Sequence, residues 1–319
     1  MYPIVLFVYN RPEHTRKALE ALKKNLLADQ SDLYVFADGA KSDATDEQIA
    51  KINAVREVVE SDKWCKNVIC NFSSENQGCR DSIINGISTV LKSFDGVIVL
   101  EDDIITSPYF LTYMNKALDY YKDRKSVFSI SGHSHSPSRF QVPADYAYDV
   151  FASPRLFNWG WGTWSDRWFQ TDWSMSYFED FSKRAYEKEA FARGGDDMFN
   201  MLWAEKNGLT SAWDIQFAYA HFRNHAVSIV PCVSYTHNFG FDGTGTHCFA
   251  SASNEDEYEI NMNPDVRFLD NLYFDSRIIN LQYSAFCSQK RKLWQKAVNF
   301  IARRIGKKPP FVIKKKVFA

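Results

Sequence analysis

The sequence lacks the motifs of several common protein classes. Its six cysteines include no Cys-x-x-Cys pair, so neither a zinc knuckle nor a dithiol redox motif is indicated, and a reduced chain is expected. No apolar run approaches the roughly 20 residues that cross a bilayer, and residues 1–8 have neither the basic start nor the cleavage site of a signal peptide. No Gly-x-Gly-x-x-Gly and no P-loop follows the first predicted strand, which disfavours dinucleotide-binding and P-loop NTPase folds.

Acidic residues are missing from the last part of the chain. The 319 residues have a net charge of −1, but no Asp or Glu follows Asp275, whereas 12 Lys and Arg lie in residues 276–319. Trp294 and Phe300 stand among these basic residues, a composition typical of helices at a membrane interface. We therefore expect residues 276–319 to form a basic amphipathic helical tail on an anionic membrane surface. A solvated tail or a partner-binding helix is the alternative.

Apolar strands alternate with amphipathic helices in the first 127 residues. The predicted strands are 3–9, 33–37, 68–72 and 97–100, and the predicted helices are 13–27, 46–59 and 78–91. This alternation indicates a parallel sheet with right-handed crossovers. The sequence therefore predicts an α/β fold, a Rossmann-like and mostly parallel sheet flanked by helices.

Aromatic residues are concentrated in the second half of the chain. Strands are predicted over 127–131 and 226–230, with a helical region over 181–207. Trp161 belongs to a block of tryptophans and glycines that is either core packing or a platform for a sugar ring. Because a carboxylate motif occurs elsewhere in the chain, we expect Trp161 to contact a sugar.

A glycine-rich run extends from His237 to His247 and contains no aliphatic residue. It predicts a mobile loop rather than a strand. Glycines allow a loop to close over a ligand, and the two histidines could reach a metal or a diphosphate. We expect His237 to contact the ligand and His247 to reach the metal; a plain surface loop is the alternative.

The most informative stretch is Gly96 to Asp103, in which a continuous apolar run leads into Glu101, Asp102 and Asp103. A run without alternation is typical of a strand buried on both faces, and ligands of α/β sheets bind beyond the carboxyl ends of strands. Three adjacent carboxylates repel one another unless a cation lies among them. Hard oxygen ligands suit Mg²⁺ or Mn²⁺ shared with substrate phosphates. The alternative interpretation is that Asp102 or Asp103 caps a helix that begins near Ser107.

Together these features resemble the GT-A fold glycosyltransferases, in particular the group around N-acetylglucosaminyltransferase I and bacterial polysaccharide sugar transferases. Residues 5–12 are similar to the opening strand of that family and its nucleotide-contacting arginine, here Arg11. Glu101-Asp102-Asp103 is identical to the family's form of the DxD motif. Trp213-Asp214 matches its Trp-Asp pair, and the resemblance spans residues 3–250.

The resemblance implies a role for each matching residue in donor binding. Asp103 would hold Mn²⁺ or Mg²⁺, with Glu101 and Asp102 beside it orienting ribose and sugar hydroxyls. Asp38 would contact the base, and Arg80, which is not the family's usual residue, would lie near the nucleotide. Residues 1–275 would form a GT-A domain whose halves, 1–127 and 128–275, bind nucleotide and acceptor respectively.

The resemblance also implies that Asp214 is the general base. A sugar hydroxyl has a high pKa and needs a carboxylate within hydrogen-bond reach as it attacks. Asp196 and Asp197 are rival candidates, but two acids at the start of a helix are more often caps. A single base opposite a leaving diphosphate implies one displacement with inversion, and a divalent ion would neutralise the charge on that diphosphate.

The predicted activity is a metal-dependent, inverting transfer of a sugar from a nucleotide donor. A UDP-sugar such as UDP-GlcNAc is favoured, with the hydroxyl of a glycan or lipid-linked glycan as acceptor, in surface polysaccharide synthesis. The expected location is cytoplasmic and peripheral on the inner face of the cell membrane, with no nucleic acid partner. A non-catalytic sugar-binding or scaffolding relative and a sugar nucleotidyltransferase are the alternatives, but the triphosphate loop of the latter is not present after the first strand.

Overall fold

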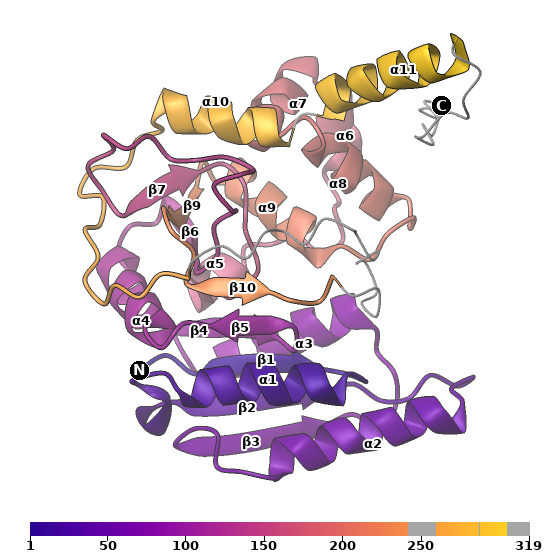
Figure 1. The fold of residues 1–319 in the computed structure, drawn as a ribbon, viewed down its shortest axis with the longest axis vertical. Helices are drawn as coiled ribbons and strands as arrows, with labels where there is room; N and C mark the ends of the chain where they lie inside the picture. The colour runs from indigo at the N-terminus through magenta and orange to yellow at the C-terminus, as the bar shows by residue number, and fades with distance from the viewer. Residues whose placement is uncertain (242–259, 287, 305–319) are drawn as a thin grey trace.

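An eight-stranded sheet forms the centre of the fold in the part of the chain that the structure describes (Figure 1). The structure is a computed structural model and describes residues 1–241, 260–286 and 288–304. The strands follow the order β3 (Asn67–Phe72), β2 (Asp32–Ala37), β1 (Ile4–Val8), β4 (Gly96–Glu101), β8 (Trp161–Trp164), β6 (Val127–Ser131), β9 (Val227–Pro231) and β7 (Val150–Ser153). Six of these strands point the same way, and β8 and β7 run antiparallel to their neighbours. The mixed α/β fold with a mostly parallel sheet is therefore confirmed.

The first four strands and their connecting helices match the predicted alternation. β1 to β4 are parallel and are joined by α1 (Pro12–Lys23), α2 (Asp46–Glu60) and α3 (Cys79–Leu91). Helix α1 ends four residues before the predicted end, and a short 3₁₀ turn, η1 (Ala28–Gln30), follows it. Helix α2 begins with a capping box between Thr45 and Gln48.

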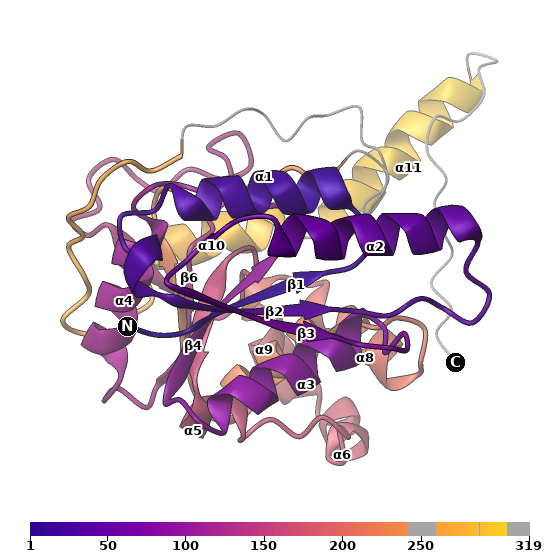
Figure 2. The same ribbon diagram turned by 90° about the horizontal axis from the view of Figure 1, so that it is seen from below.

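Side chains of the central strand β1 alternate between two cores. Ile4 and Leu6 pack in the cluster that contains residues of α1 and α2, whereas Val5 and Phe7 pack in the cluster that contains residues of α3. Figure 2 shows α1 and α2 on one side of β1 to β3 and α3 on the other. Burial on both faces explains the continuous apolar run in the sequence of β4.

The second half builds a more irregular layer around β8, β6, β9 and β7. Helix α4 (Phe110–Tyr121) precedes β6, and the short α5 (Ser165–Trp168) follows β8. The single predicted helical region over 181–207 is wrong in its continuity. The structure instead has α6 (Phe178–Lys183), α7 (Ala185–Phe191), a 3₁₀ turn η2 (Ala192–Gly194) and α8 (Met198–Lys206). An extended backbone at Arg184 (ψ 96°) and Gly195 with φ 146° cause the breaks.

The stretch from Trp213 to Asn238 contains α9, β9 and β10. Helix α9 (Trp213–Arg223) leads into β9, and β10 (Thr236–Asn238) pairs antiparallel with β5 (Ile104–Thr106). The prediction of a loop without a strand from His237 is therefore wrong for His237 and Asn238. Their pairing with the segment that follows the acidic motif supplies hydrogen bonds that the local sequence does not reveal.

The C-terminal segment begins as part of the packed fold. Helix α10 (Ser276–Ala285) buries Ile278 against Phe140 and Phe151, and Gln282 Oε1 accepts a hydrogen bond of 3.1 Å from Ser153 Oγ. The expected division at residue 275 therefore does not coincide with a change in packing. Helix α11 (Ser288–Arg304) follows it and extends away from the sheet (Figure 2). Among the described residues, no helix is both long enough and apolar enough to span a membrane.

Candidate active site

The acidic motif lies at the carboxyl end of β4, next to the central strand β1. Glu101 is the last residue of β4 and pairs in register with Phe7 of β1. Asp102 and Asp103 form the turn into β5 and are only 4% and 8% exposed. The acidic motif thus lies beyond the carboxyl end of a strand, where α/β sheets bind ligands, and this placement agrees with the prediction from the sequence.

Arg11 joins the two aspartates. It precedes α1, so the strand-to-helix turn after β1 carries its side chain to the end of β4. Its Nε donates to Asp102 Oδ2 at 3.3 Å, and its Nη2 donates both to Asp102 Oδ1 and, at 3.0 Å, to Asp103 Oδ2. A charge-assisted fork of this kind compensates carboxylates that would otherwise be costly to bury.

Glu101 connects this cluster electrostatically to Asp214. Burial raises the pKa of Glu101, as do the charges of Asp103, Asp102 and Asp214, while the charge of Arg11 opposes the shift. Asp214 lies in the first turn of α9, where the helix dipole favours a carboxylate. The structure therefore brings the predicted base close enough to the acidic motif for their charges to interact.

Cys79, at the first residue of α3, was not among the predicted site residues. Burial of the thiol is the main cause that raises its pKa to about 12, and the charges of Glu101 and Asp214 add to the shift. Part of the residue is nevertheless exposed. The amino end of α3 thus lies within the electrostatic field of both acids. The sequence signal for this position was the glycine directly before it, which marks the start of a helix. In the structure Gly78 has a φ of 79°, a conformation that favours glycine.

The residues after β10 cover Asp103. Phe239 N donates to the backbone oxygen of Asp103 at 3.1 Å, and its ring stacks on His14 of α1 at 4.8 Å. A Cβ on Gly240 would lie only 2.4 Å from Asp103 Oδ2, so a larger residue does not fit there without movement. This close approach is the structural reason for a glycine in the run that was predicted to be a loop.

Asp38 lies at the end of β2 and organises the loop that precedes α3. Its carboxylate accepts hydrogen bonds from Gly39 N, Asn76 Nδ2, Gln77 N and Gly78 N at 2.8–3.0 Å. The charge of Asp38 also contributes, after burial, to a raised pKa of Tyr9 at the end of β1. Asp38 therefore has a structural role in the loop before α3. It also influences Tyr9, which follows β1 at the same edge of the sheet as the acidic motif.

Arg80 points to α8 and α9 rather than to the acidic motif. Its guanidinium lies 3.2 Å from Glu205 Oε1 and donates to Gln216 Oε1 at 3.2 Å. Glu205 is buried and also accepts hydrogen bonds from Ala212 N at 2.6 Å and Gln216 Nε2 at 3.0 Å. Glu205 thus fixes the turn that leads to Asp214.

Sequence reasoning missed this role of Glu205. A lone acid directly after the apolar Leu202, Trp203 and Ala204 was the signal that could have identified a buried carboxylate. Its partners could not be named from the sequence because they lie in three different elements.

Two other predictions on site residues need correction. Trp161 is 1% exposed and stacks on Trp213 with ring centroids 5.2 Å apart, so it is a core residue and not a sugar platform. Asp197 precedes α8 without a capping hydrogen bond and instead pairs with Arg155 at 2.8 Å, so the interpretation of this acid as a cap is wrong.

The two histidines of the glycine-rich run have separate outcomes. His237 lies on β10, and its charge contributes, after burial, to a lowered pKa of His133. Its pairing with Ile105 places it beside the segment that follows the acidic motif. His247 lies outside the described residues.

The donor set fits a hard cation that is shared with a ligand. Within the described ranges, no three or more His, Cys, Asp or Glu residues are arranged to hold a metal ion by themselves. Mg²⁺ sites that use one or two carboxylates together with substrate phosphates do not require such a cage. Asp103, with acidic neighbours on the same turn, has the oxygen chemistry for that kind of site.

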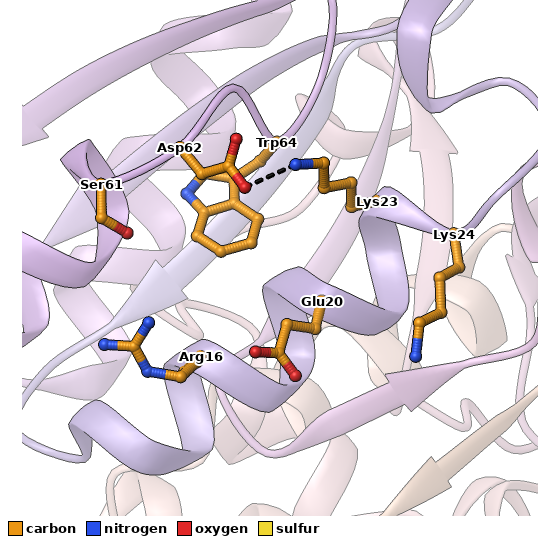
Figure 3. A pocket seen from close by; sticks show the side chains of 7 residues that line it. All are labelled: Arg16, Glu20, Lys23, Lys24, Ser61, Asp62 and Trp64. Carbon is orange, nitrogen blue, oxygen red and sulfur yellow. Dashed lines mark hydrogen bonds and ion pairs between the residues drawn. The ribbon is translucent and has the colours of Figure 1, made fainter.

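A surface hollow lies away from these residues. It has a volume of about 760 Å³ and is lined by residues of α1 and by residues that follow α2, including Arg16, Lys24 and Trp64 (Figure 3). An ion pair between Lys23 and Asp62 crosses it at 2.5 Å. None of the predicted site residues lines this hollow, so we do not associate it with the acidic motif.

Comparison with known proteins gives limited matches. No protein-family model matches the sequence, and no curated protein is significantly similar to it. Among solved structures, the fold is similar to S. aureus TarS 1–349, with 12% identity and a TM-score of 0.41 over 74% of this chain and 60% of that one. A second TarS structure matches with 11% identity and a TM-score of 0.40 over 76% of this chain and 37% of that one.

A mammalian structure is also similar. Apo mouse xyloside xylosyltransferase 1 matches with 10% identity and a TM-score of 0.34 over 69% of this chain and 80% of that one. This chain thus spans less than two thirds of the two TarS chains. Likenesses this distant carry no inference about activity, which must be argued from the residues themselves.

Proposed function

We propose that the protein is a metal-dependent, inverting glycosyltransferase of the GT-A type that uses a nucleotide-sugar donor. The observation that carries this proposal is the Glu101-Asp102-Asp103 cluster at the carboxyl end of β4, in which both aspartates are buried, with Asp214 within electrostatic range of Glu101. A second, separate carboxylate near a cation-compatible acidic cluster is the arrangement that a metal-assisted displacement with a general base requires.

Each residue of the site has a distinct task in this proposal. Asp103 would hold Mn²⁺ or Mg²⁺, which when bound neutralises the charge of the leaving diphosphate. Asp214 accepts the proton of the attacking hydroxyl, and Glu205 and Gln216 orient the start of α9 that carries it. Tyr9, beside Asp38 at the end of the sheet, provides a ring on which a base can stack.

The donor and acceptor classes follow from the same interpretation. We infer a UDP-sugar, UDP-GlcNAc being the first to test, and a glycan or lipid-linked glycan as acceptor, in surface polysaccharide synthesis. The basic α11, which exposes Leu293, Phe300 and Ile301, supports a peripheral position on an anionic membrane on the cytoplasmic side, where lipid-linked acceptors are accessible.

The decisive experiment is calorimetric titration of UDP with and without Mn²⁺. For the wild-type protein we expect Mn²⁺ to strengthen UDP binding and EDTA to reverse the effect. Asp103→Asn should lose at least about 10-fold of the Mn²⁺-dependent affinity, because it removes the charged metal ligand. Asp62→Asn, a change of the same kind in the hollow of Figure 3, is the matched control. Equal affinity in Asp103→Asn and wild type would refute the proposal.

A further inference from the structure

Arg11 is the only cation that an ion pair joins to the acidic motif in the described structure. Its Nη2 lies 3.0 Å from Asp103 Oδ2 and also contacts Asp102. The side chain is mostly buried, and its Nη1 is shielded from solvent without a hydrogen-bond partner among the described residues. A buried guanidinium that leaves a donor unused is not in its best available environment.

Residues that follow β10 approach the same oxygen atom. A Cβ on Gly240 would come within 2.4 Å of Asp103 Oδ2, and the Phe239 amide is anchored to the Asp103 backbone. Arg11 and Gly240 therefore both lie close to Asp103 Oδ2. A metal ion that binds this oxygen atom must compete with Arg11, because the backbone of residues 239 and 240 is held by hydrogen bonds.

We propose that Arg11 is an exchangeable counter-ion that competes with the divalent metal for Asp103 and is released when a diphosphate binds its guanidinium. The inference rests on the proposed function, since it concerns the same metal and diphosphate. A guanidinium matches phosphate oxygens as well as carboxylates, so a diphosphate offers Arg11 an alternative partner, including one for Nη1.

This exchange predicts coupled binding of the two ligands. Without a diphosphate, Mn²⁺ must displace Arg11 from Asp103 and leave it with Asp102 as its ion-pair partner among the described residues, so the metal binds weakly. With UDP present the displaced guanidinium gains a partner, and the metal binds more tightly. By linkage, Mn²⁺ then strengthens UDP binding by the same factor.

The test is the affinity for Mn²⁺ alone, measured from the electron paramagnetic resonance signal of free Mn²⁺, in wild type and Arg11→Gln. We expect Arg11→Gln to bind Mn²⁺ without nucleotide at least about 10-fold more tightly than wild type, because its competitor is gone. UDP should then strengthen the binding of Mn²⁺ by a smaller factor than in wild type, because only the direct contacts between phosphate and metal remain. Arg16→Gln, on the helix that Arg11 precedes but in the hollow of Figure 3, should behave as wild type.

A second variant protects the test against loss of folding. If Arg11→Gln is unfolded by circular dichroism, Arg11→Lys keeps the charge but not the fork that contacts both aspartates, so it should raise the affinity for Mn²⁺ alone by a smaller factor. Unchanged or weaker Mn²⁺ binding in the folded variant would overturn the proposal. That result would leave the proposed function standing if Mn²⁺ still strengthened UDP binding in the wild type, so the two failures are distinguishable.

Discussion

At the scale of single residues, the site is short of positive charge. Arg11 contributes one unit of positive charge, whereas Glu101, Asp102 and Asp103 are three buried or half-buried carboxyl groups. Burial raises the pKa of Asp102 as well as that of Glu101, although the adjacent Arg11 acts in the opposite direction. The cluster is thus best stabilised by an additional cation, which is what a metal bound together with a diphosphate would supply.

The role of Asp214 can be separated from donor binding. Asp214→Asn removes the proposed proton acceptor but keeps the shape of the side chain, so we expect turnover to fall by about 100-fold or more with donor affinity nearly unchanged. The measurement is steady-state sugar transfer, combined with calorimetric titration of UDP. The anomeric configuration of the product, determined by NMR, should be inverted relative to the donor.

Asp180→Asn is the matched control for this change. Asp180 also lies in the first turn of a helix, α6, but is exposed, so its substitution should leave both turnover and affinity unchanged. Near-normal turnover in Asp214→Asn, or retention of configuration, would contradict the assignment of Asp214 as the base.

The acids of the site could be predicted from the sequence, but their partners could not. A carboxylate run after a buried strand indicates a site because strand ends and charges are local features. The contact of Arg11 with Asp102 spans 91 residues, and its geometry depends on the pairing of β1 with β4. Trp161 was misjudged because a tryptophan between glycines fits both a core and a sugar platform, and only packing distinguishes the two.

At the scale of helices and strands, the position of α9 depends on a buried carboxylate. Glu205 of α8 accepts from the Ala212 amide, just before α9, and from Gln216 within it, while Arg80 of α3 pairs with the same group. Three helices therefore meet at one side chain. The arrangement sets where Asp214 stands relative to the end of β4.

We predict that Glu205→Gln alters catalysis through Asp214 rather than through the donor site. The amide keeps one acceptor but presents a donor to groups that are themselves donors, which should cost about 1–3 kcal/mol of stability. Turnover should fall while the affinity for UDP stays near that of wild type. Thermal unfolding and separate measurement of kcat and UDP affinity test this expectation.

The control for this prediction is Glu189→Gln on α7, an exposed position at which the same change should affect neither property. Glu205→Asp keeps the charge and should recover part of the lost turnover. A variant that lost stability but kept its turnover would show that Glu205 has no positioning role.

The elements of the first half were more predictable than those of the second. From β1 to β4, short strands and amphipathic helices alternate, and local periodicity determines both. Between α6 and α8, breaks at Arg184 and Gly195 depend on how the short helices pack, and the aromatic composition conceals them. β10 forms because β5 lies opposite it, which no property of residues 236–238 indicates.

At the scale of the whole molecule, charge and packing divide the C-terminal segment at α11. Helix α10 is held by Ile278 and Gln282, whereas α11 exposes the large apolar side chains of Leu293, Phe300 and Ile301. Phe300 follows Leu293 by seven residues, close to two turns, and Ile301 is the next residue, so the three side chains lie within an arc of about 100° around the helix. A basic helix with an exposed apolar side and no acidic residue matches an anionic lipid surface in both charge and hydrophobicity.

The last prediction therefore concerns deletion of residues 288–319, which removes α11 and the rest of the C-terminus but leaves the packed α10. The full-length protein should co-sediment with vesicles that contain anionic lipid, and the truncated protein should not. Each basic residue near such a surface contributes about 1 kcal/mol, and salt should weaken this part of the binding. Burial of the apolar side chains adds a contribution that salt does not screen, so some binding should persist at high ionic strength.

Two controls separate membrane binding from other roles of this segment. Neutral vesicles should bind the full-length protein more weakly, because the electrostatic attraction is lost. Titration of Mn²⁺ and UDP should give the same affinities before and after truncation, because Asp103 and Asp214 lie on elements that α11 does not form part of. Failure of the full-length protein to co-sediment with anionic vesicles at low salt would refute the membrane role of α11. A change of oligomeric state on truncation, measured by sedimentation, would then indicate that α11 binds a second copy of the chain.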